Sequence, residues 1–213
     1  MLDSGLFTQS FMVHAWISAT IVAVLCACTG FFVVLRGSAF AAHALPKAGF
    51  AGAAGAVLSG INPLYGLSLF AVGGALLIGA LGRRERNDVA TALTLVAALG
   101  TGALFLSLTN QYATGAYALL FGQIVGVSAG QVWDTAVLAC VCLLAVAFLS
   151  RPLLLASISP EIAGSRGVPV RLLETGFLLV VGLVTAVTVP VVGALLCFSL
   201  LVGPMAAGGY LAA

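Results

Sequence analysis

Long uncharged runs limit what this chain can fold into more than any other feature of its sequence. Stretches of about 20 apolar residues recur along it, and each is long enough to cross a lipid bilayer as a helix. Only 7% of the 213 residues are charged, whereas soluble domains carry about 25%. So few charges cannot cover a water-soluble surface. The sequence therefore predicts an all-α polytopic membrane protein, because lipid offers backbone groups no hydrogen-bond partner outside their own helix.

Turns and charges divide the chain into about seven predicted spans within a single transmembrane domain, residues 1–213. The spans cover residues 11–35, 39–59, 63–82, 89–109, 131–150, 172–189 and 191–212. Residues 116–127 are also apolar, but about a dozen residues suit a re-entrant or half-span element better than a full crossing. The patterning leaves open whether this segment crosses. We also expect Pro190 to break the helix in which it lies.

The arginines give the predicted spans an orientation. Seven of the eight basic residues lie near span ends, namely Arg36, Arg83, Arg84, Arg86, Arg151, Arg166 and Arg171. If residues 116–127 do not cross, all seven fall on one side, which the positive-inside rule makes cytoplasmic. If they do cross, the basic residues divide between both sides. We favour the first topology, with the N-terminus outside, and basic residues at span ends give no indication of nucleic-acid binding.

Residues 151–174 contain an unusual share of the charge, and they lie between two apolar runs. The charged residues of this segment are Arg151, Glu161, Arg166, Arg171 and Glu174. Ser159 followed by Pro160 is typical of a helix N-cap and first helical position. Gly167 can end that short helix, and Pro169 can start the next one. The pattern predicts a helix–turn–helix finger outside the bilayer, which either binds a partner or only connects two spans.

Several segments, taken in order, resemble one known family. They are residues 159–163 (Ser-Pro-Glu-Ile-Ala), 166–174, 32–36, 62–66, 117–122, 191–196 and 201–204. Together they look like the ABC-3 family, the membrane permeases of ABC importers for zinc, manganese or iron. The resemblance covers nearly the whole chain.

This resemblance implies a type II ABC importer permease fold and a function in importing divalent metal ions, zinc or manganese above all. It implies that a coupling loop at about 151–171 docks onto a separate cytoplasmic ATPase. The residues implied in this docking are Ser159, Pro160, Glu161, Arg166, Gly167 and Arg171. Further implied partners are an extracytoplasmic metal-binding protein and a second permease copy or a sister permease. Since such permeases continue with about two more spans, we expect either a natural short form of the family or a partial gene, in the cytoplasmic (inner) membrane of a prokaryote.

One polar pair lies inside a predicted span. His43 and Lys47 are four residues apart and therefore share a helix face. Lys47 lies about 15 Å along its helix, near the middle of the membrane. A charge there costs about 3 kcal/mol unless it is paired or hydrated. The position therefore predicts a polar cavity or a counter-ion, although a hydrated lysine or a buried histidine without a role is also consistent with it.

The same pair departs from the family pattern. Permeases that this chain resembles typically show Asp-Ala-Leu-Ser-His-Ala here, with the acidic residue and the histidine facing the metal path. His43 stands where the aspartate is expected and Lys47 where the histidine is expected. The resemblance thus implies a substrate path along both residues, with His43 as a candidate metal ligand. Lys47 can bind a metal only as the neutral amine, and its charged form repels divalent ions.

Other function classes have less support. No glycine-rich loop with Gly-Lys-Ser/Thr occurs, so ATP hydrolysis is expected on a separate subunit and no bound cofactor is expected. No His-Glu-x-x-His or Gly-x-Ser-x-Gly motif indicates a membrane hydrolase. A proton-coupled secondary transporter that uses His43 and Lys47 and a truncated, non-transporting membrane protein stay as alternatives.

Overall fold

The computed structural model describes residues 9–82, 87–108, 121–167 and 169–211 of the chain. These residues form α-helices, one 3-10 helix and turns, and no strand lies among them. The elements are α1 (Ser10–Leu35), α2 (Ala39–Leu58), α3 (Pro63–Leu81), α4 (Asn87–Leu108), η1 (Ile124–Gly126), α6 (Ala129–Ile158), α7 (Pro160–Ser165), α8 (Val170–Val192) and α9 (Ala194–Leu211). The predicted all-α class is confirmed.

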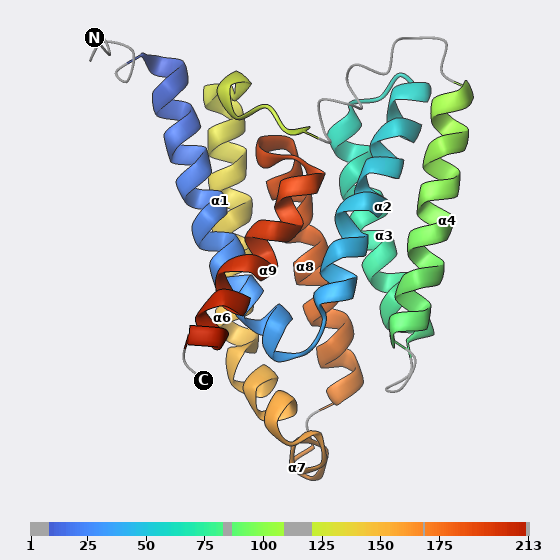
Figure 1. Cartoon of the computed structure of the whole chain (residues 1–213), viewed down its shortest axis with the longest axis vertical. Coiled ribbons are helices and arrows are strands. Elements are labelled where there is room, and N and C mark those ends of the chain that lie inside the picture. The colour runs from blue at the N-terminus through green and yellow to red at the C-terminus, as the bar shows by residue number, and fades with distance from the viewer. Residues whose placement is uncertain (1–8, 83–86, 109–120, 168, 212–213) are drawn as a thin grey trace.

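The long helices lie side by side along one axis, and α8 is the helix around which the others pack (Figure 1). It contacts α1, α2, α3, α6 and α9. Its side chains Phe177, Val181 and Val184 are at most 1% exposed. The short helix α7 lies at one end of the molecule, and α1 begins at the opposite end (Figure 1).

Five of the described helices are long and apolar enough to cross a membrane. They are α1, α3, residues 88–108 of α4, α6 and α8. α2 has 20 residues but includes His43 and Lys47, and the apolar part of α9 is shorter, at Ala194–Gly208. Large apolar side chains such as Leu69 and Phe148 are exposed on the outside of the bundle, where lipid suits them. The chain is a multi-pass membrane protein.

The end of α6 differs from the prediction. We expected the span to end at residue 150, but α6 continues to Ile158 and includes Pro152. Proline removes one backbone hydrogen bond from a helix. Here Leu153 and Ala156 of the continued segment are buried in the core, and this packing offsets the loss. The predicted finger is therefore shorter than expected and begins at Ser159.

The end of α8 was also predicted wrongly, because Pro190 does not break the helix. α8 runs on to Val192 and ends at Gly193, whose φ of 93° lies in the left-handed region. Glycine enters that region without the steric cost that a Cβ imposes. The glycine, and not the proline, therefore separates α8 from α9.

Only part of the apolar segment 116–127 lies within the described residues, which begin again at 121. Its described part contains the 3-10 helix η1, which packs on α1. The backbone N–H of Gln123 donates to the carbonyl of Pro190 at 3.3 Å, near the end of α8. Residues 121–127 thus pack against the bundle without a helix long enough to cross. The arginines at 83, 84 and 86 lie outside the described residues.

Two glycines bring α2 and α3 into backbone contact. A Cβ on Gly52 would collide with the carbonyl oxygen of Gly66, and a Cβ on Gly66 with that of Gly52. Between membrane helices, such small-residue contacts supply van der Waals packing that lipid cannot replace. The contact sets the position of α2, and so of the polar residues that α2 carries.

We expect Gly52→Ala to destabilise the protein, because its Cβ would have to displace the backbone of α3. Gly73→Ala is the matched control, since a Cβ there meets nothing within 4 Å and alanine favours a helix by about 1 kcal/mol over glycine. Thermal unfolding of both variants in detergent would measure the difference. Equal unfolding temperatures for both variants would show that the α2–α3 contact is not needed.

Candidate functional site

The predicted polar pair is formed as a direct contact on α2. The Nζ of Lys47 lies 2.8 Å from the Nε2 of His43, and both side chains are partly buried. A protonated lysine amine can only donate, so this hydrogen bond requires the lone pair of an unprotonated Nε2. The ring of Phe198 on α9 packs edge-on against the imidazole, with ring centroids 4.7 Å apart. The structure thus brings together the two predicted residues and adds an aromatic neighbour.

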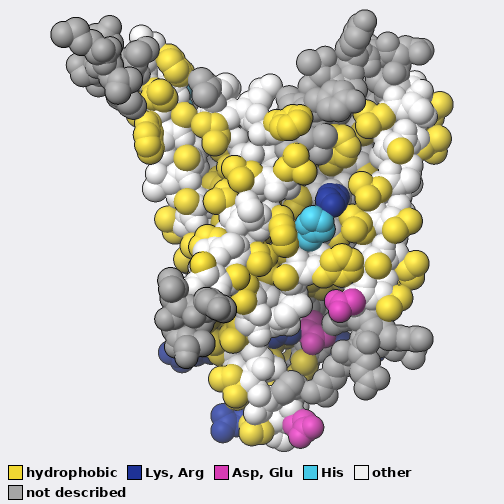
Figure 2. Space-filling model, viewed as in Figure 1, with side chains coloured by type: hydrophobic (Ala, Val, Ile, Leu, Met, Phe, Trp, Pro, Cys, Tyr) yellow, Lys and Arg dark blue, Asp and Glu magenta, His cyan; other side chains and the backbone are white. Residues whose placement is uncertain are grey.

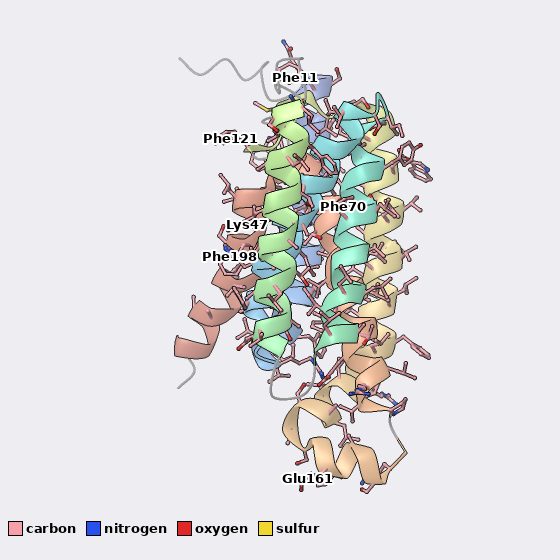
Figure 3. All side chains as sticks on the ribbon, turned by 90° about the vertical axis from the view of Figure 1, so that its right-hand side faces the viewer. Phe11, Lys47, Phe70, Phe121, Glu161 and Phe198 are labelled. Atoms are coloured by element: carbon pink, nitrogen blue, oxygen red, sulfur yellow. The ribbon has the colours of Figure 1, made fainter. Side chains whose placement is uncertain are left out.

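The pair lies on an outer face of the chain. Figure 2 shows a histidine and a basic side chain next to one another at mid-height of a largely apolar face. Figure 3 places Lys47 and Phe198 on the same side, well away from Glu161 at the α7 end. A charged amine at this depth is costly against lipid tails. The face around the pair therefore needs protein or water against it.

The predicted short helix forms with the boundaries that its sequence indicates. α7 starts at Pro160, and Gly167, with a φ of 77°, follows its end. Ser159 occupies the N-cap position, but its side chain makes no capping hydrogen bond. Instead its carbonyl accepts from the N–H of Ala163 at 3.0 Å.

The α7 end combines a buried anchor with an exposed surface. Ala163 is fully buried against the main core, so α7 is held to the bundle. Ile158, Ile162 and Leu172 are at least half exposed there. Exposed apolar side chains grouped with charges are typical of a protein-binding surface.

The predicted coupling residues gather at this one end. Ser159, Pro160, Glu161, Arg166, Gly167 and Arg171 lie in or beside α7 and the first turn of α8. Glu161, Arg166 and Arg171 are exposed, and Figure 2 shows acidic and basic side chains at this end. His43 and Lys47 lie apart from them, at mid-height on the outer face of the bundle. The structure therefore has two candidate sites rather than one.

Sequence reasoning missed an ion pair beside the α7 end. The Nη2 of Arg36, directly after α1, lies 3.5 Å from the Oε1 of Glu174 in α8. Burial lowers the pKa of the Arg36 guanidinium from its ordinary value, while the Glu174 carboxylate acts in the opposite direction. The two residues are 138 positions apart, so no local spacing links them. The available signal was that both lie at predicted span ends on the same side.

A groove on the bundle lies near neither candidate site. This groove, of about 870 Å³, opens between α3, η1, α6 and α8, toward the end opposite α7. Its lining includes Tyr65, Trp133 and Asp134 beside an apolar floor from α8. Among the described parts of the chain, no group of three His, Cys, Asp or Glu side chains is placed to hold a metal ion. His43 is therefore a candidate metal ligand that does not belong to such a group.

Comparison with known proteins agrees with this architecture. The "Manganese transport system membrane protein MntC" of Listeria monocytogenes is 30% identical over 204 residues, which cover 95% of this chain and 72% of the relative. The "Manganese import system permease protein ScaB" of Streptococcus parasanguinis is 29% identical over 204 residues, with the same coverage. The solved structure of PsaBC from Streptococcus pneumoniae in complex with Fab is similar with a TM-score of 0.80 and 25% identity. That match covers 97% of this chain and 75% of the solved one.

The helical bundle and these relatives define a membrane permease of the ABC transporter class. The family model of the ABC 3 transport family matches residues 8–213, and the chain belongs to that family. The family resemblance of its sequence is thereby confirmed.

We expect Lys47→Met to stabilise the isolated chain in lipid nanodiscs, by up to about 3 kcal/mol, because it removes a charge from mid-membrane depth. Arg151→Met is the matched control, since this exposed arginine lies near the α7 end of α6, where water solvates its charge. Thermal unfolding of both variants would measure the effect. A loss of stability confined to Lys47→Met would instead assign the lysine a structural role.

Proposed function

We propose that this chain is the membrane-spanning permease subunit of an ABC importer for manganese ions. Family membership supports transport by an ABC system. The names of two bacterial relatives, a manganese transport system membrane protein and a manganese import system permease protein, support manganese rather than zinc. The permease itself does not hydrolyse ATP, and this reaction takes place on a separate cytoplasmic subunit. The bacterial relatives favour the inner membrane as its location.

Seven helices cross the membrane in this proposal. They are α1, α2, α3, α4, α6, α8 and α9, and α2 tolerates its polar residues because they face a path and not lipid. α3 ends and α4 begins toward the α7 end (Figure 1), next to the arginines of the intervening loop. That end is then cytoplasmic by the positive-inside rule, and the chain begins outside the cell. Residues 1–213 act as a single transmembrane domain.

The α7 end is the docking site for the ATPase. The exposed Ile162 supplies an apolar anchor of the kind found in stable interfaces, and Glu161, Arg166 and Arg171 supply complementary charge around it. Ser159, Pro160 and Gly167 mark the start and end of α7, and Ala163 anchors the helix to the core, so the docking surface is formed before the partner binds. Preorganisation of this kind lowers the entropic cost of association.

The substrate path follows the outer face that carries His43 and Lys47. A second copy of the chain, or a sister permease, covers this face and encloses a hydrated path between the two proteins. His43 offers a nitrogen ligand to the passing metal ion. Lys47 repels a divalent ion when it is charged, so it acts as an electrostatic barrier that passage must overcome. An extracytoplasmic metal-binding protein delivers the ion at the end opposite α7.

The proposed function is tested by metal accumulation. Cells with and without the gene, grown under metal limitation, are compared for total manganese, zinc and iron. We expect a selective loss of manganese in the deleted strain, which the intact gene restores. A selective loss of zinc or of iron would instead identify that metal as the substrate. Uptake that collapses with an uncoupler and persists without the ATPase would favour a secondary transporter, and no change in any metal would contradict import.

We expect Glu161→Arg to weaken binding of the ATPase and to lower manganese uptake, because it reverses a charge on the exposed face of α7. The measurement is co-purification of the ATPase with the tagged permease. Ser150→Arg is the control, since it adds a positive charge on α6 outside the docking surface. Normal co-purification of Glu161→Arg would show that α7 is not the contact.

A further inference from the structure

The ion pair between the buried Arg36 and the partly exposed Glu174 joins two segments, each of which neighbours one candidate site in the sequence. Only four residues separate the end of α7 from the start of α8. Glu174 lies in the second turn of α8, and Arg36 lies three residues before the start of α2. The pair therefore links the helix after the docking surface to the helix that carries His43 and Lys47.

The environment of Arg36 is unusual for a charged side chain. Its side chain is only 8% exposed, whereas that of Glu174 is 32% exposed. Its guanidinium also lies 5.8 Å from the ring centroid of Phe177, a cation–π contact within α8. Two residues of α8, one turn apart, thus hold the same guanidinium.

The hydrogen-bond capacity of Arg36 is not fully used. Its Nη1 is buried and has no hydrogen-bond partner among the described residues. The 3.5 Å separation to Glu174 is longer than the 2.7–2.9 Å usual for a charge-assisted hydrogen bond. A small cavity of about 90 Å³, lined by Arg36, Asp88 and Glu174, lies beside the pair. A buried donor without a partner is costly. The cavity gives the guanidinium room for a second arrangement in which it lies closer to the Glu174 carboxylate.

The turn that follows Arg36 is short and hydrogen-bonded throughout. The N–H of Arg36 donates to the carbonyl of Phe32 at 3.0 Å, and that of Ser38 donates to the carbonyl of Val33 at 2.9 Å. The N–H of Ala42, in the first turn of α2, donates to Ser38 at 3.0 Å. A displacement of Arg36 is therefore passed to the start of α2 rather than absorbed in a loose connection.

We propose that Arg36 and Glu174 are positioning residues that transmit movement of α7 to α2, so that ATPase docking and the His43–Lys47 face change together. Displacement of α7 moves the first turns of α8, Glu174 and Phe177 carry the guanidinium with them, and the turn of Arg36 shifts α2. The inference rests on the proposed function, because it assigns a driving partner to α7.

The first test compares transport with ATP hydrolysis in proteoliposomes that contain the assembled transporter. Glu174→Gln keeps the side-chain shape but removes the charge, and Arg36→Lys keeps the charge but removes the planar fork. We expect manganese uptake per complex to fall about tenfold in each, within the range typical of coupling between two sites, while ATP hydrolysis falls much less. Thr101→Ser, an equally conservative change at an exposed position of α4, is the control and should leave both rates unchanged.

A merely structural role predicts a different result. Uptake and ATP hydrolysis would then fall in proportion, and the ATP consumed per manganese ion would stay constant, which would overturn the proposal. The double variant Arg36→Glu with Glu174→Arg restores the opposite charges. We expect it to recover part of the uptake that either single charge reversal loses.

A second test does not depend on transport. Ser38→Cys is introduced where the exposed native thiols have been removed by Cys28→Ala and Cys140→Ala, and its labelling rate is followed. We expect addition of the ATPase and ATP to change this rate, and Glu174→Gln to abolish the change. If the wild-type transporter moves no metal but this response is present, the proposed substrate is wrong and the coupling stands. If the rate does not respond to the ATPase, the coupling inference is overturned.

Discussion

The packing of five helices around α8 is the interaction on which the rest of this structure depends. In a membrane, burying an apolar helix against its neighbours gains no hydrophobic free energy from water, because lipid tails are equally apolar. Stability comes instead from close van der Waals contact. α8 supplies that contact with a buried series of valines and Phe177, and α2 supplies it through small residues that approach α3 and α4. Each neighbour of α8 is therefore placed by shape complementarity rather than by charge.

This arrangement explains why so few polar groups occur inside the bundle and why those few are informative. The hydroxyls of Thr94 and Thr185 donate to carbonyls within their own helices and need no partner elsewhere. His43 and Lys47 bond to each other across one turn, but their face remains open at mid-depth. Arg36 is the other cation held away from water among the described residues, and it depends on a carboxylate from a different helix. His43 and Lys47 lie on α2 and Arg36 directly follows α1, and both of these helices touch α8.

The sequence predicted much of the candidate site because much of it is local. His43 and Lys47 are four residues apart, so helix geometry alone places them together. Pro160 and Gly167 mark the ends of α7 by their own conformational preferences. The ion pair between Arg36 and Glu174 was not predictable in this way, since its residues meet only after α1 and α8 have packed. Phe198 was missed for the same reason, because it reaches His43 from a helix more than 150 positions later.

What the sequence by itself determined is the class of structure. Its shortage of charge and the length of its apolar runs leave membrane-spanning helices as the only way to satisfy the backbone, and its ordered motifs indicate the family. Local sequence did not determine how far α6 and α8 extend. Both helices continue through a proline, Pro152 in α6 and Pro190 in α8, because packing around the proline offsets the lost hydrogen bond. Nor did local sequence determine which side chains meet between helices. Only tertiary structure decided those points, because contact between distant segments depends on the complementary shapes of whole helices, which no short stretch of sequence contains.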